Sequence, residues 1–141
     1  MTLQYSKKQI FKALLFAPLP LLFFMALFFI IANHQFSLYQ ISVALVGHAI
    51  VYLAYCILTI PFSFTISFFL SYLQALNLLT ICIFSLFFAN FFFLIMGWVH
   101  TGIIPHQWWK SYLNPLSIFM SLFPGICYWL FLIGATDKER K

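Results

Sequence analysis

The chain has 141 residues, of which 65% are hydrophobic and 6% are charged, and its formal net charge is +5. Ordinary soluble domains carry about 25% charged residues, so this composition excludes a water-exposed globular fold. No Asp, Glu, Lys or Arg occurs between Ala13 and Trp109. A chain that crosses a lipid bilayer needs such a charge-free interval, because a charged side chain at the bilayer centre costs roughly 2.5–3.5 kcal/mol.

Six of the seven Lys and Arg residues lie near the two ends of the chain, next to the first and last apolar runs. The residues are Lys7, Lys8, Lys12, Lys138, Arg140 and Lys141. This is the positive-inside pattern, which predicts that both termini are cytoplasmic and that the basic ends meet the lipid bilayer. The net charge is therefore not interpreted as a nucleic-acid footprint.

The first predicted transmembrane span covers residues 11–32. It contains Pro18 and Pro20, which would break a soluble helix. In a membrane, neighbouring helices can satisfy the carbonyls that a proline leaves free, so we expect a kink. No small-x-small cleavage site follows the span, which favours a retained anchor over a signal peptide.

Residues 39–98 are almost continuously apolar. At 1.5 Å per residue they would form about 90 Å of helix, which suits two crossings and a connection. We expect the second span at residues 39–60, with a possible continuation past a kink at Pro61. The turn is predicted within residues 63–77 and the third span at 78–98.

The longest polar interruption, residues 99–115, precedes a fourth predicted span at 116–134, where Pro124 and Gly125 indicate a bend. Four side chains of the interruption and one of the earlier loop are predicted to lie at the membrane interface: His100, His106, Trp108, Trp109 and His34. Three imidazoles on one side could bind Zn or Cu. The histidine spacing is not a recognised ligand pattern, so we predict interfacial residues and no metal.

An even number of spans places both basic ends on the same side. The sequence therefore predicts an all-α integral membrane protein, a four-helix transmembrane bundle forming one membrane domain over residues 1–141. The Phe-rich, acid-poor composition favours a multi-pass protein of a bacterial inner membrane.

Polar and small side chains form a stripe on each of two spans. Steps of three and four connect Gln40, Ala44, His48, Tyr52, Tyr55 and Thr59 on the second, and Asn114, Ser117, Ser121, Gly125 and Tyr128 on the fourth. Such faces support close helix packing with hydrogen bonds across the seam. His48 is ionisable and mid-span, so a proton-relay, ligand or axial haem role remains an alternative to packing.

The sequence lacks the residues that most catalytic mechanisms require. No carboxylate occurs before Asp137, and no Gly-rich phosphate loop occurs. Cys56, Cys82 and Cys127 lie in different apolar spans without a Cys-x-x-Cys pair. We therefore predict a protein that is not an enzyme and has no cofactor.

We therefore predict that the protein acts through helix contacts with another integral membrane protein. Its role would be that of an immunity or exclusion factor or an accessory subunit. In size and predicted topology the chain resembles the small immunity proteins that protect bacteria from pore-forming bacteriocins. One alternative is a channel, holin or transporter-like homo-oligomer with a polar stripe lining a pathway. The other is a cytochrome b-like anchor subunit that uses His48.

Overall fold

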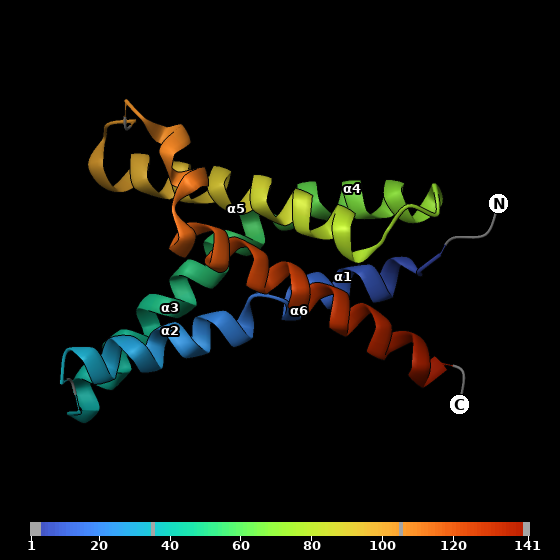
Figure 1. Cartoon of the computed structure of the whole chain (residues 1–141). Coiled ribbons are helices and arrows are strands. Elements are labelled where there is room, and N and C mark those ends of the chain that lie inside the picture. The colour runs from blue at the N-terminus through green and yellow to red at the C-terminus, as the bar shows by residue number, and fades with distance from the viewer. Residues whose placement is uncertain (1–3, 35, 105, 140–141) are drawn as a thin grey trace.

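A computed structural model describes residues 4–34, 36–104 and 106–139, and the regular elements within these residues are all helices. Figure 1 shows them as α1 (Lys7–Phe16), α2 (Leu19–Ala32), α3 (Leu38–Leu58), α4 (Ile60–Tyr72), α5 (Leu78–Thr101), the 3₁₀ helix η1 (Trp108–Leu113) and α6 (Pro115–Glu139). Four segments are long and apolar enough to cross a membrane: Lys7–Ala32, Leu38–Leu58, Leu78–Thr101 and Pro115–Ala135. An all-α chain with four such segments is confirmed.

The first of these segments is bent where its prolines lie. Helix α1 ends at Phe16, and α2 begins at Leu19 with Pro18 as its N-cap and Pro20 in its first turn. A proline nitrogen carries no hydrogen, so the Leu14 carbonyl loses the partner it would have in a continuous helix. The predicted kink is present, and it leaves backbone oxygens in need of donors.

The second candidate span is Leu38–Leu58, and after a bend at Thr59 the chain continues as a further helix, α4. Pro61 stands in the first turn of α4, where the missing N–H has no helical partner to lose. The Thr59 N–H still donates to the Tyr55 carbonyl at 2.8 Å, and the Ser63 N–H donates to Thr59 at 3.0 Å. The proline therefore starts a new helix instead of a turn.

The turn between the second and third spans is confined to residues 73–77. Asn77 ends it by capping α5: its side chain accepts from the Thr80 N–H at 3.0 Å, and the Thr80 hydroxyl accepts from the Asn77 N–H at 3.1 Å. This reciprocal pair satisfies two donors at the helix start. At 13 residues, α4 is too short to cross a bilayer alone.

The helices pack as neighbouring pairs. Helix α3 contacts α2 and α4 contacts α1, so the second bent segment follows the first. Helix α6 packs on α5 and also contacts α1. Figure 1 shows that the start of α1, the end of α6 and the α4–α5 turn lie at one end. At the other end, α2 and α3 diverge from α5.

We call the first region the closed end and define it by its buried core, which consists of Ile10, Ala13, Leu14, Ala17, Leu76, Ile81, Tyr128 and Leu132. The splayed end consists of α2, the first half of α3 and the last half of α5. The core therefore lies at the end of the molecule that carries the chain's first and last described residues.

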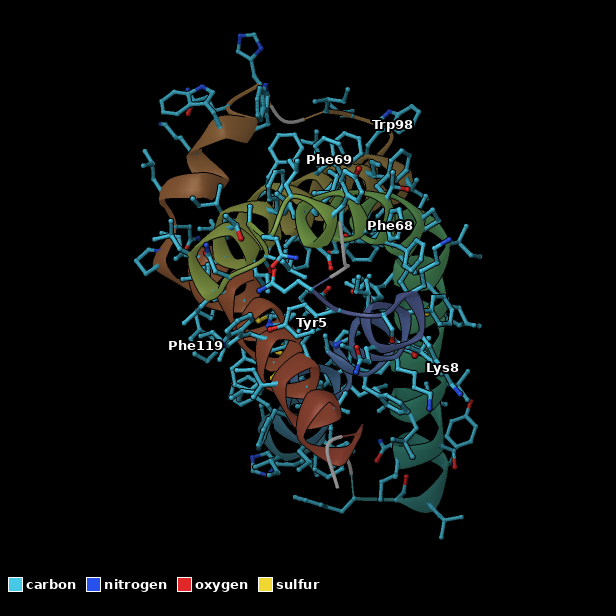
Figure 2. The ribbon with its side chains drawn as sticks, turned by 90° about the vertical axis from the view of Figure 1, so that its right-hand side faces the viewer. Tyr5, Lys8, Phe68, Phe69, Trp98 and Phe119 are labelled. Carbon is cyan, nitrogen blue, oxygen red and sulfur yellow. The ribbon has the colours of Figure 1, made fainter. Side chains whose placement is uncertain are left out.

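Ser71 ties the segment before α1 to the closed end. Its hydroxyl is fully buried and accepts from the Tyr5 N–H at 2.9 Å, while the Ser71 carbonyl accepts from the Gln4 N–H at 3.2 Å. The Tyr5 ring meets Trp129 edge-to-face with centroids 6.5 Å apart. Figure 2, which looks onto the closed end, shows Tyr5 in the middle of the helices and Lys8 at their outer side.

Candidate functional site

Two tyrosines of the polar stripe on the second span, which is α3, donate hydrogen bonds at the proline kink of the first span. The Tyr52 hydroxyl donates to the Leu15 carbonyl at 2.9 Å, and the Tyr55 hydroxyl donates to the Leu14 carbonyl at 3.4 Å. Both acceptors lie in the last turn before Pro18, where the regular hydrogen-bond ladder is interrupted. The two phenols thus act as substitute donors for the interrupted helix.

His48 bonds within its own helix. Its Nδ1 lies 2.8 Å from the Ala44 carbonyl, one turn earlier. Because a carbonyl oxygen only accepts, Nδ1 carries the proton in this contact. The ring is half-buried and faces the central cavity described below, and Thr59, at the end of the same stripe, is buried.

The α6 stripe forms a tight seam with α5. The Ser85 hydroxyl donates to the Ser121 carbonyl, and the fully buried Ser121 hydroxyl donates to the Ser117 carbonyl at 2.6 Å. A Cβ added at Gly125 would lie 2.8 Å from the Ser85 Cβ. The small residues of this stripe therefore let the two backbones approach closely, as membrane helix pairs commonly do.

A cavity of about 290 Å³ lies between the helices and receives side chains from α1 to α6. Half of its 26 lining residues are Leu, Ile, Met or Phe, and its polar members carry hydroxyl groups or, at His48, an imidazole. Tyr128 stands in this wall at 4% exposure, and its hydroxyl oxygen has no hydrogen-bond partner. This arrangement offers hydrogen bonds to an uncharged molecule.

Sequence reasoning missed the contribution of α4 to the cavity. Ser63 and Ser67 both line it, although they were placed in the turn. The signal was present: Thr59, Ser63, Ser67 and Ser71 follow steps of four, which is the spacing of one helix face. That spacing predicts a helix through residue 71.

The predicted interfacial residues are exposed and belong to two separate places. His34 lies in the turn after α2. His100 lies in the last turn of α5, and His106, Trp108 and Trp109 follow that helix. In Figure 1 these segments occupy different corners of the splayed end. Among the described residues, no three His, Cys, Asp or Glu side chains come together as a metal site would require.

No family model, curated protein or solved structure matches this chain. Functional inference therefore rests on its own residues. The cavity lining contains hydroxyl groups and one imidazole, without a carboxylate or an ammonium group. Such a set can donate hydrogen bonds to an uncharged ligand and orient it.

Proposed function

We propose that this chain is a four-helix transmembrane bundle of a bacterial inner membrane, with both termini cytoplasmic, that contacts another integral membrane protein. Its role would be that of an immunity or exclusion factor or an accessory subunit. The observation that carries the proposal is the outer face of α3, which no other helix of the described chain covers.

Helix α3 is the least covered of the four candidate spans. Of its most apolar stretch 6% is buried, compared with 17–22% in the other three. Six large side chains on its outer face are more than half exposed and follow steps of four and three: Tyr39, Val43, Val46, Ile50, Leu53 and Ile57. This spacing is that of a helix–helix seam.

The residues beside this seam favour a helix as the occupant. Gly47 and Ala49 flank it, and a Cβ at Gly47 would meet nothing within 4 Å. Small flanking residues allow a second backbone to come close, and β-branched Val and Ile lose little rotamer freedom when packed. Lipid alone would be accommodated equally well by larger side chains, so the combination supports a protein partner.

The two alternative functions have less support. In a water-filled pathway, Tyr52 and Tyr55 would present free hydroxyls, but both donate to carbonyls of the first span. A bis-histidine haem site would need a second imidazole near His48, and the lining of the cavity holds one histidine. Both alternatives remain as outcomes of the experiments below.

Photocross-linking in the native membrane tests the proposal. A diazirine amino acid at Val46 should form a discrete adduct with one protein, and Gly47→Leu should lower its yield by about tenfold. The matched controls carry the probe at Leu79 and the substitution Ile83→Trp, both on the exposed side of α5. Adducts to lipid alone, or equal yields from Val46 and Leu79, would contradict a protein partner on α3.

Thiol labelling tests the pathway alternative. Tyr52→Cys and Tyr55→Cys should resist a water-soluble maleimide in sealed vesicles, because both positions face the first span. Ready labelling of both would instead support a channel. A Soret band that is lost in His48→Ala would establish the haem alternative.

A further inference from the structure

We propose that the central cavity is a binding site for a neutral lipid chain whose carbonyl oxygen accepts a hydrogen bond from the Tyr128 hydroxyl. This inference concerns a ligand inside the bundle and does not depend on the partner proposed for α3. It rests on three features of the cavity: its walls, its unpartnered donor and its shape.

The walls select an uncharged, mostly hydrocarbon ligand. Three phenylalanines of α5, Phe84, Phe88 and Phe92, stand on one side, and Leu21, Leu22 and Met25 of α2 also line the cavity. No Asp, Glu, Lys or Arg is among the lining residues. At about 290 Å³ the cavity is near the lower bound of roughly 300 Å³ for small-molecule pockets, so it fits part of a lipid instead of a whole one.

Tyr128 supplies one donor that the protein itself leaves unused. Its side chain is 4% exposed, and its hydroxyl has no hydrogen-bond partner; Ser67 is a polar neighbour but does not meet the geometry of a hydrogen bond. Two other polar residues of the lining are engaged, since Tyr55 donates to Leu14 and Ser85 donates to Ser121. A buried phenol without an acceptor is destabilising, and a ligand oxygen would remove that cost.

The shape of the cavity matches a hydrocarbon chain that has a polar atom at one end. The cavity extends from Leu76 and Tyr128 at the closed end to Met25 and Phe93 at the splayed end. A carbonyl at Tyr128 would place the attached hydrocarbon along the Phe and Leu walls. Two membrane components have this chemistry, the acyl ester of a glycerolipid and the ketone of a prenyl quinone.

Photolabelling in vesicles tests the site with named probes. Full-length protein is reconstituted with a phosphatidylglycerol that carries a diazirine in one acyl chain or, separately, with a diazirine-bearing prenyl quinone. We expect at least one probe to label α5 or α6 residues of the cavity wall, and the arm that labels identifies the source of the carbonyl. Tyr128→Phe should lower that labelling by about fivefold, the effect of losing one hydrogen bond.

Two further variants separate binding from folding. Ala89→Phe fills the cavity and should abolish labelling, whereas Leu79→Phe places the same ring on the exposed side of α5 and should not. Tyr128→Phe also removes an unpartnered hydroxyl, so in lipid-free detergent it should melt at the same temperature as wild type or higher, while its labelling falls. A Tyr128→Phe variant that keeps full labelling, or cavity residues that neither probe labels, would overturn the proposal.

Discussion

The closed and splayed ends are made from the same apolar residue types, yet only the closed end is densely packed. At the closed end, small Ala13 and Ala17 let α1 approach its neighbours, and Ser71 bonds to the segment before α1. At the splayed end, Phe23 and Phe28 of α2 are 61% and 70% exposed. In lipid, apolar character does not decide which surfaces pack together; small residues and hydroxyl groups decide it.

The largest difference between the two ends should appear when the same residue type is truncated in each. Ile10→Ala, in the core of the closed end, removes a fully buried side chain and should lower the free energy of unfolding by roughly 1–3 kcal/mol. Ile31→Ala, on α2 at the splayed end, removes a side chain that is 59% exposed and should change it by less than about 0.5 kcal/mol. Unfolding by SDS titration in mixed micelles measures both values, and equal losses would refute the assignment of the core.

A smaller effect is expected from adding one methyl group to the α5–α6 seam. Gly125→Ala places a Cβ against Ser85 and should cost roughly 1–2 kcal/mol in the same titration, because the two helices must separate. Gly134→Ala is the matched control on α6, since a Cβ there meets nothing within 4 Å. Equal effects of the two substitutions would contradict the close approach of α5 and α6 at Gly125.

The smallest effect should come from the donors of the proline kink. Tyr52→Phe leaves the Leu15 carbonyl without its donor and should cost about 0.6 kcal/mol, the average of membrane hydrogen bonds measured in double-mutant cycles. Replacing both prolines, Pro18→Ala with Pro20→Ala, allows a continuous first helix, so in that background Tyr52→Phe should cost less. A cycle with no coupling between the two prolines and Tyr52 would show that the tyrosine does not stabilise the kink.

The sequence predicted the apolar segments and the first kink because both depend on local features, namely charge-free runs and prolines. It left open whether the helix continues past Pro61 and placed the turn within residues 63–77, because a proline disfavours helix at the residue before it. The structure has α4 in this segment, with Pro61 in a first turn that tolerates it. The steps of four between Thr59, Ser63 and Ser67 are the spacing of one helix face and would have predicted this helix.

The site was predicted only as two polar faces. Which way each face turns could not be derived, because nearly every other position of these helices is apolar and the usual amphipathic signal for helix rotation is absent. In the structure the residues of the two stripes have different roles: Tyr52 and Tyr55 bond to the first span, and His48 bonds to its own helix. Tyr128, of the α6 stripe, has an unused donor in the cavity.

The kink of the first span also bears on how the chain is synthesised. The donors for the Leu15 and Leu14 carbonyls are 37 and 41 residues further along the chain, on the second span. A nascent chain emerging at the membrane would carry both carbonyls unpaired until that span arrived, and unpaired backbone groups are costly in hydrocarbon. The first two spans are therefore best inserted together as a helical hairpin, with the ribosome supplying Tyr52 and Tyr55 before the first span leaves the translocon.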